Sequence, residues 1–163
     1  MKNRKVNNII NGVQTSDGAG VKLRRIIGGP ELNMLDPFLL FDDFGSDNAD
    51  DYIAGFPSHP HRGFETITYM ISGKFRHKDS AGNEGFLSDG SVQWMTAGKG
   101  VIHSEMPEKT NGKVKGFQLW LNLPRSLKMI EPSYNDIPSS DIPIVNLNNG
   151  TLRVISGSFQ NIK

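Results

Sequence analysis

The chain contains no long apolar run; short stretches of strand-forming residues are separated by tight-turn signals along most of its length. The 163 residues include 18 glycines and 9 prolines. Turn signals fall at residues 16–20, 72–74, 80–83 and 97–100, and at the pair Asn111 and Gly112. Closely spaced turns leave room for strands of four to eight residues but not for long helices. The sequence therefore predicts an all-β protein, an antiparallel sandwich or barrel.

The expected strands cover residues 21–27, 35–44, 64–71, 75–78, 91–95, 101–106 and 114–121, with a loop at 45–58. Residues 64–71 alternate, which places Glu65, Ile67, Tyr69 and Ile71 on one face of a strand. If this strand begins near His59, that face points into the protein together with the histidines at positions 59 and 61.

Charge and composition narrow the function classes. The 18 basic and 17 acidic residues give a net charge of +1, which provides no electrostatic case for binding nucleic acid or a membrane surface. There is no cysteine, so disulfides, thiolate metal sites and cysteine nucleophiles are excluded. No stretch approaches the ~20 apolar residues of a membrane-spanning helix, and no apolar signal core follows the basic start. We expect a cytoplasmic protein.

Two short segments carry three of the four histidines: His59-Pro60-His61 and His103-Ser104-Glu105. Each segment places two candidate metal ligands at positions i and i+2, which lie on the same face of a strand. Two such pairs facing each other inside a barrel would bring three imidazoles and one carboxylate together. This donor set suits divalent iron, nickel, copper, manganese or zinc. The sequence therefore predicts a metal site made by His59, His61, His103 and Glu105.

Several residues have alternative interpretations. Glu105 could form an ion pair with Arg62 or Lys99, with the imidazoles acting only in packing. His77 lies among charged residues and is expected to be a solvated surface side chain. Glu65 could coordinate the metal, orient a metal ligand, or point inward and pair with an arginine.

Phe64, Trp94 and Met95 could line a pocket above the metal, although aromatic and methionine side chains at strand spacing more often belong to the core.

Beyond Leu123 the sequence changes in character. Four prolines, at positions 124, 132, 138 and 143, are spread through a mostly polar segment in which a short helix is expected near residues 125–130. This segment predicts an extended connection. A further strand is expected at residues 151–158.

The sequence resembles the pirin family of the cupin superfamily over about residues 13 to 160. The matching stretches are LDPFLLFDDF at 35–44, HPHRGFET at 59–66, QWMTAGKGVIHSEMP at 93–107 and QLWLNL at 118–123. The resemblance implies a cupin, or jelly-roll, antiparallel β-barrel. It also implies a metal, usually iron, held by His59, His61, His103 and Glu105.

Two departures from the wider pattern stand out. Cupins usually take the carboxylate ligand from the first motif, where Glu65 stands, whereas Glu105 of the second motif is expected here as in pirins. Thr96 replaces the usual proline of the second motif.

Length is the larger departure, because pirins carry a second barrel of similar size. We expect a barrel at residues 1–123, a linker at 124–150 and the first strand of a missing second cupin domain at 151–163. The surface left by that missing barrel would favour self-association.

The resemblance implies two classes of function. The first is a quercetin 2,3-dioxygenase, which opens a flavonol with dioxygen and releases carbon monoxide; Glu105 would be the catalytic base, Fe²⁺ the expected ion and a flavonol-like molecule the partner. The second is a non-enzymatic, metal- or redox-responsive regulatory protein that binds a protein partner, either as a transcription co-regulator or on a metabolic enzyme. An inactive truncated remnant is a third alternative. Fold and ligands are common to the first two classes, so access of a substrate to the metal is what separates them.

Overall fold

The computed structural model describes residues 5–108 and 113–163. Within these ranges the regular secondary structure is strands and three short 3₁₀ turns, with no α-helix. The predicted turn at Asn111 and Gly112 lies outside the described residues. The 3₁₀ turns are η1 (Ala49–Asp51), η2 (Arg125–Leu127) and η3 (Ser139–Asp141). The strands are β1 (Val13–Asp17), β2 (Val21–Ile27), β3 (Phe38–Ser46), β4 (Phe56–His61), β5 (Phe64–Ser72), β6 (Phe75–Asp79), β7 (Glu84–Leu87), β8 (Val92–Thr96), β9 (Val101–Pro107), β10 (Val114–Asn122), β11 (Ser133–Ile137), β12 (Ile144–Leu147) and β13 (Gly150–Arg153).

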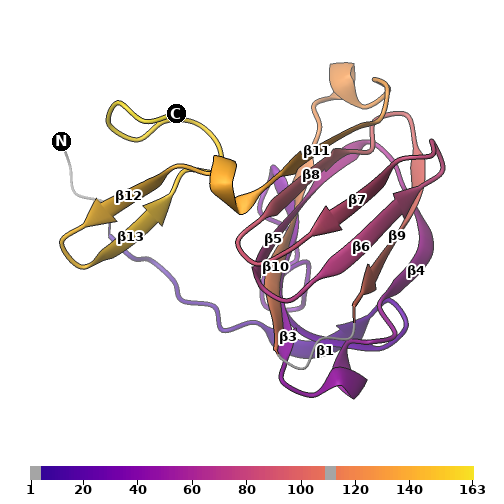
Figure 1. Cartoon of the computed structure of the whole chain (residues 1–163), viewed down its shortest axis with the longest axis horizontal. Helices are drawn as coiled ribbons and strands as arrows, with labels where there is room; N and C mark the ends of the chain where they lie inside the picture. Colours follow the sequence, from indigo (N-terminus) through magenta and orange to yellow (C-terminus); the bar gives the residue numbers. More distant parts are fainter. Residues whose placement is uncertain (1–4, 109–112) are drawn as a thin grey trace.

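Two antiparallel sheets face each other and form a cupin-type barrel (Figure 1). The larger sheet has seven strands in the order β1-β2-β3-β10-β5-β8-β11, and the smaller has four in the order β4-β9-β6-β7. Strands that are distant in sequence are therefore neighbours: β10 lies between β3 and β5, and β9 lies between β4 and β6. The all-β fold class and the barrel architecture are confirmed.

Apolar side chains fill one end of the space between the sheets. Val21, Leu23 and Phe44 of the larger sheet pack with Phe75 and Leu87 of the smaller one in a single buried cluster. The Phe44 and Phe75 rings meet edge to face with their centroids 5.8 Å apart, so the two sheets interlock there. The predicted site residues lie outside this cluster, and a second, smaller apolar cluster is formed by Met95, Ala97 and Val101 packed against Tyr134.

The predicted continuous strand from His59 to Ile71 is wrong. The chain turns at Arg62 and Gly63, and Gly63 has a φ of 79°, a left-handed conformation that favours glycine. β4 and β5 consequently belong to opposite sheets.

The turn also reverses the face of β5 that points inward. Thr66, Thr68 and Met70 are buried, whereas Ile67 and Tyr69 are partly exposed on the outer side of the larger sheet.

Phe41 and Phe117 stack on neighbouring strands with ring centroids 5.5 Å apart, and both are partly exposed. The self-association expected through an exposed surface stays a prediction.

The segment expected to be an extended connection contains a strand of the barrel. β11 pairs with β8 along residues 133–137 and forms the edge of the larger sheet. The expected short helix near residues 125–130 is the 3₁₀ turn η2. The division into a barrel, a linker and a second unit stays a prediction, but the barrel's sheet extends as far as Ile137.

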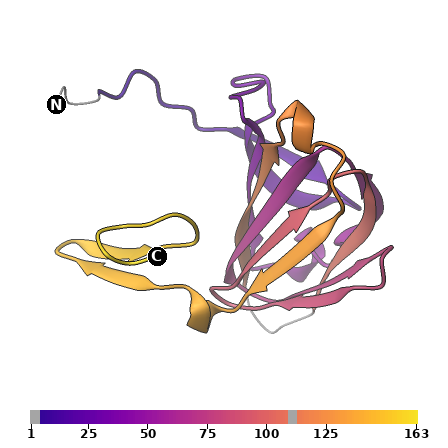
Figure 2. The same ribbon diagram turned by 90° about the horizontal axis from the view of Figure 1, so that it is seen from above.

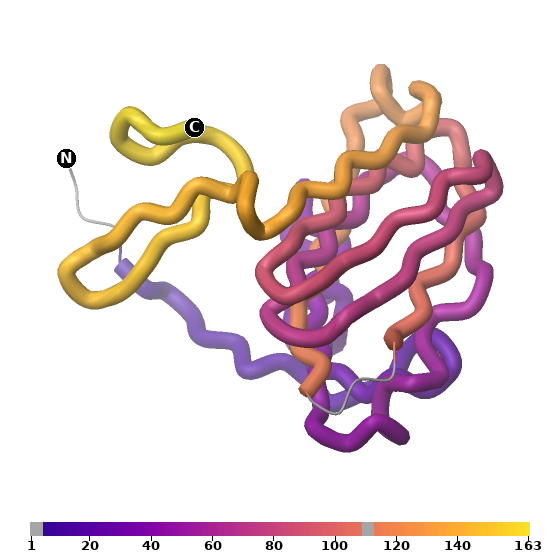
Figure 3. Tube along the Cα trace, in the orientation of Figure 1, coloured from indigo at the N-terminus to yellow at the C-terminus, as the bar shows by residue number. Residues whose placement is uncertain are grey.

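β12 and β13 form a separate two-stranded sheet that projects from the barrel (Figures 1 and 2). β13 begins where a strand was expected, but it ends at Arg153. The tube view shows the N-terminal segment running away from the barrel on the same side as this hairpin (Figure 3). None of the described residues forms a helix long and apolar enough to cross a membrane.

Candidate metal centre

The two histidine segments lie on paired strands. In the β4–β9 ladder His59 is directly opposite His103, and His61 is opposite Val101. His61 and His103 are buried and His59 is half-buried, so all three rings turn toward the inside of the barrel, as their i and i+2 spacing predicts. A register shift between Phe56 and His59 separates this part of β4 from the start of the strand.

The three imidazoles converge through their Nε2 atoms. His59 Nε2 lies 2.9 Å from His61 Nε2 and 2.9 Å from His103 Nε2. Among the described residues, these three histidines form the one group whose ligand atoms are close enough together to hold a metal ion.

Two imidazole nitrogens about 2.1 Å from one ion, at right angles to each other, would be about 3.0 Å apart. The observed separations fit this arrangement.

The surroundings fix which nitrogen of His59 carries the proton, and they favour the neutral form of His61 and His103. His59 Nδ1 lies 2.8 Å from the carbonyl oxygen of Pro57, to which it donates its proton, so the lone pair is on Nε2. Burial, reinforced by repulsion from the neighbouring imidazoles, lowers the pKa of His61 and the pKa of His103 to about 3 each. The three Nε2 atoms face one another at hydrogen-bond distance, and a divalent cation would accept a lone pair from each of them.

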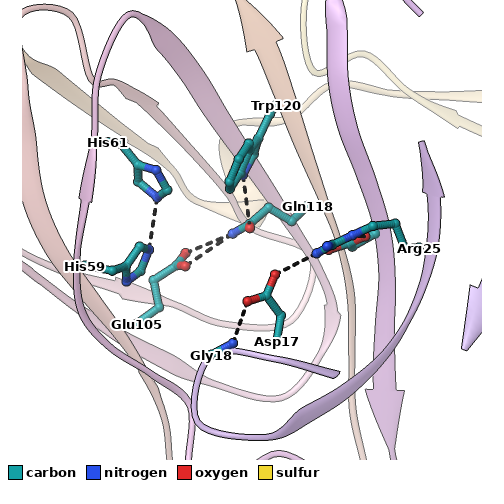
Figure 4. Close-up of polar contacts among 9 residues, drawn as sticks. Asp17, Gly18, Arg25, His59, His61, Glu105, Gln118 and Trp120 are labelled. Atoms are coloured by element: carbon teal, nitrogen blue, oxygen red, sulfur yellow. Dashed lines mark hydrogen bonds and ion pairs between the residues drawn. The ribbon is translucent and has the colours of Figure 1, made fainter. Parts of the chain in front are cut away.

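Glu105 is buried beside the histidines, and its partners come from the opposite sheet. Gln118 Nε2 on β10 donates to Oε2 at 3.2 Å and to Oε1 at 3.4 Å (Figure 4). Thr68 on β5 also donates to Oε1, at 3.3 Å. The alternative ion pairs for Glu105 do not form, because Lys99 pairs with Glu131 and Arg62 donates to the sulfur of Met129. The role of Glu105 as a ligand and base stays a prediction.

A cleft of about 540 Å³ opens onto the imidazole cluster. Phe64 and Trp120 form an aromatic wall, with ring centroids 4.7 Å apart, and both rings contact the edge or face of His61 at about 5 Å. The residues that line the cleft are Asp17, Gly18, Ala19, Phe56, Pro57, Ser58, His59, Pro60, His61, Arg62, Phe64, Gln118 and Trp120.

The prediction for pocket-lining residues is correct for one of three. Phe64 lines the cleft, whereas Met95 is completely buried in the core and Trp94 is turned toward Glu65. The tryptophan of the cleft is Trp120, whose Nε1 donates to Gln118 Oε1 at 3.3 Å. Alternation along residues 114–121 groups Trp120 with Val114, Gly116 and Gln118, but the pairing of β10 between β3 and β5 decides that this face points inward.

Glu65 has none of its expected roles. Its carboxylate accepts hydrogen bonds from Trp94 Nε1 at 3.0 Å and from Thr96 Oγ1 at 2.7 Å. These contacts lie on the outer side of the larger sheet, because Glu65 follows the same alternation as Ile67 and Tyr69. The carboxylate of the first motif therefore accepts hydrogen bonds within the larger sheet and is not part of the histidine cluster.

His77 is not the solvated histidine that its charged neighbours suggest. It is 1% exposed on β6, and its Nδ1 lies 3.4 Å from His103 Nδ1 and 3.3 Å from the Tyr134 hydroxyl. Burial lowers the pKa of His77, and burial together with the charges of Glu105, Asp79 and Asp136 raises the pKa of Tyr134. Strand alternation places Phe75 and His77 inside and the two charged neighbours, Arg76 and Lys78, outside.

A second polar group lies at the rim of the cleft. Arg25 on β2 donates to Asp17 at 2.6 Å and to both oxygens of the buried Asp42 at 2.7 and 2.9 Å (Figure 4). Asp17 in turn accepts a hydrogen bond from the backbone N–H of Gly18 at 2.7 Å. Arg25 thereby links Asp17, at the end of β1, to Asp42 on β3 within the larger sheet.

Fold and site together define a class: a cupin-type β-barrel with a three-histidine cluster in its mouth. The family model for pirin matches residues 20–121, and the chain belongs to the pirin family. A pirin-like protein of Caulobacter vibrioides is 54% identical over 158 residues, which are 96% of this chain and 57% of that protein. Pirin of Rattus norvegicus is 48% identical, over 92% of this chain and 50% of its own length.

A solved structure has a similar fold. The crystal structure of a quercetin 2,3-dioxygenase from Acinetobacter baumannii superposes with a TM-score of 0.83 at 37% identity, over 94% of this chain and 57% of that one. This chain thus spans about half the length of the curated relatives it matches.

Proposed function

We propose that this chain carries the metal centre of a pirin-type oxidoreductase that cleaves flavonols with dioxygen, in the manner of quercetin 2,3-dioxygenase. The observation that carries the proposal is the convergence of three imidazoles, two of which line an aromatic-walled cleft. His59, His61, His103 and Glu105 would hold a divalent ion, with Fe²⁺ the expected one. Such an ion would supply Lewis acidity toward a substrate oxygen.

The cleft suits a planar, polyhydroxylated aromatic substrate. Phe64 and Trp120 offer an apolar wall, and Asp17 and Gln118 provide hydrogen-bonding groups elsewhere in the lining. A volume of about 540 Å³ lies within the range of small-molecule sites, roughly 300–1,000 Å³. A flavonol ring placed against the aromatic wall would bring its hydroxyl near the histidines.

Glu105 is proposed as the base that takes the proton of the substrate hydroxyl. Its two oxygens accept hydrogen bonds from Gln118 and Thr68, which hold the carboxylate in position. These donors come from β10 and β5, so the larger sheet fixes the orientation of a group carried by the smaller sheet. The proton would remain beside the substrate while the ring is opened.

A regulatory protein that binds a partner without turnover is the alternative. It would use the same fold and the same histidines, so neither feature separates the two functions. Access to the cluster favours the enzyme, because the cleft reaches His59 and His61 from outside and a sensor needs no such opening.

The test is metal content and turnover of the purified chain beside a His59→Ala/His103→Ala variant. We expect about one transition-metal ion per chain after anaerobic loading with Fe²⁺, consumption of a flavonol with release of carbon monoxide, and loss of both in the variant. Stoichiometric metal without turnover of any flavonol would favour the regulatory alternative. A folded chain that binds no metal would refute the proposal.

A further inference from the structure

The side of His103 that faces away from the cleft is occupied by two buried polar groups. Its Nδ1 lies 3.4 Å from His77 Nδ1 and 3.3 Å from the Tyr134 hydroxyl oxygen. His77 Nδ1 lies 3.3 Å from the same oxygen, so the three atoms form a nearly equilateral triangle. The residues come from β9, β6 and β11, which belong to both sheets of the barrel.

The hydroxyl proton of Tyr134 has another acceptor. The O–H group donates to the sulfur of Met95, which is completely buried, at 2.7 Å. Because the proton points to the sulfur, the lone pairs of the hydroxyl oxygen are free to accept hydrogen bonds from ring N–H groups. Tyr134 is thereby an acceptor toward the two imidazoles.

His77 fits the same assignment. Its Nε2 is buried and has no hydrogen-bond partner. An orphaned buried N–H is rarer than an orphaned acceptor, so the proton of this ring belongs on Nδ1, where Tyr134 accepts it. Both imidazoles would then donate from Nδ1 to one oxygen.

We infer that Tyr134, backed by His77 and Met95, is a positioning residue that holds His103 in the tautomer protonated on Nδ1. The Nε2 atom of His103 is then left with its lone pair directed at His59 and His61. The carbonyl of Pro57 does the same for His59. Two of the three rings of the cluster therefore have their tautomer fixed by an acceptor behind them.

This role assigns a function to β11. The strand is the outer edge of the larger sheet, yet through Tyr134 it reaches a ring on the smaller sheet. The importance of the tautomer rests on the proposed metal function, because only an unprotonated Nε2 can bind a cation. The tautomer itself can be measured without any metal.

The experiment is long-range ¹H–¹⁵N NMR of the metal-free full chain labelled at histidine, compared with Tyr134→Phe and, as control, Tyr69→Phe. We expect His103 to be protonated on Nδ1 in the unsubstituted chain and in the control, and to shift mainly to the Nε2-protonated form in Tyr134→Phe. Affinity for Co²⁺ should fall about 10- to 100-fold in Tyr134→Phe, as is usual when the partner of a ligating imidazole is lost.

Met95→Leu provides a second variant that keeps the phenol. Without the sulfur acceptor, the Tyr134 O–H can turn toward His103 Nδ1 as a donor, so the Nε2-protonated population should rise there too. Thermal melting of each variant reports folding separately from the tautomer.

Protonation of His103 on Nε2 in the unsubstituted chain would overturn the inference, and so would an unchanged tautomer in Tyr134→Phe. A chain that shows the expected tautomers but binds no metal would support the positioning role while refuting the proposed metal function.

Discussion

The two pairs of proposed ligands have the same spacing but occupy unlike places in the barrel. His59 and His61 lie on β4, an edge strand of the smaller sheet, where Pro60 is exposed and the strand register shifts. His103 and Glu105 lie on β9, between β4 and β6, and both are buried. The edge pair lines the cleft, whereas the inner pair is joined by hydrogen bonds to the core. The same i and i+2 pattern therefore places one pair of side chains at the open cleft and the other pair in contact with buried side chains of the core.

His103→Ala should have the largest effect, because it removes a cluster ligand and a buried ring together. We expect loss of metal binding and a decrease in the free energy of unfolding of about 2–3 kcal/mol, since His77 and Tyr134 lose a buried partner. Metal analysis and urea unfolding measure the two effects.

His59→Ala is the matched variant on the edge strand. It should weaken metal binding with less than half that loss of stability, because the ring is half-buried. Equal destabilisation by both variants would contradict the contrast between the two strands.

Glu105→Gln separates the chemistry of the inner pair from its packing. The change keeps the shape of the side chain and removes the base, so flavonol turnover should fall about 10²- to 10⁴-fold with metal retained. Glu65→Gln is the control, because its carboxylate contacts Trp94 and Thr96 instead of the cluster. Unchanged turnover in Glu105→Gln would remove the proposed base.

The pH dependence of the free energy of unfolding tests one histidine of each pair, His61 and His103, for burial in the folded protein. The pKa values of His61 and His103, about 3 each, lie below the ordinary value of 6.5, so between these values the unfolded chain binds more protons than the folded one. Stability of the metal-free protein should therefore fall as the pH drops through this window, by up to about 1.4 kcal/mol per pH unit for each group.

Urea unfolding of chelator-treated protein across this window checks the slope. His61→Asn should reduce it, because that side chain does not titrate. The same slope in the variant would show that His61 does not contribute.

Pro60→Ala should have the smallest effect. The ring is exposed on an edge strand and donates no hydrogen bond, so the substitution should change the free energy of unfolding by no more than about 0.5 kcal/mol and leave metal affinity unchanged. A large loss of metal affinity would mean that the proline itself orients His59 and His61. Isothermal titration with Co²⁺ would detect it.

The i and i+2 spacing was sufficient to identify the three histidines of the cluster, because strand alternation fixes which side chains share a face whatever the topology. The same rule predicts the wrong face for Ile67 and Tyr69, because the turn at Gly63 moves β5 to the other sheet. Two of the inward positions are threonines beside the buried Met70, and one of them, Thr68, contacts Glu105. Ile67 and Tyr69 lie on the outer face, so the apolar residues of this strand do not by themselves identify its buried side.

The contacts of His77 and Tyr134 with His103 could not be predicted from the sequence. Charged neighbours and a proline-punctuated segment suggested a surface histidine and a linker, yet both side chains meet behind His103. Their meeting depends on β6 pairing with β9 and β11 pairing with β8, which are contacts between distant parts of the chain.

The sequence by itself determined the all-β class, the pirin family and the three histidines, because strand period, turn residues and motif spacing are local properties. The tertiary structure decided which tryptophan lines the cleft, which face of β5 is buried, and what supports the cluster from behind. These depend on the order in which the strands pair, and the pairing order is set by the packing of the whole barrel and not by any local segment.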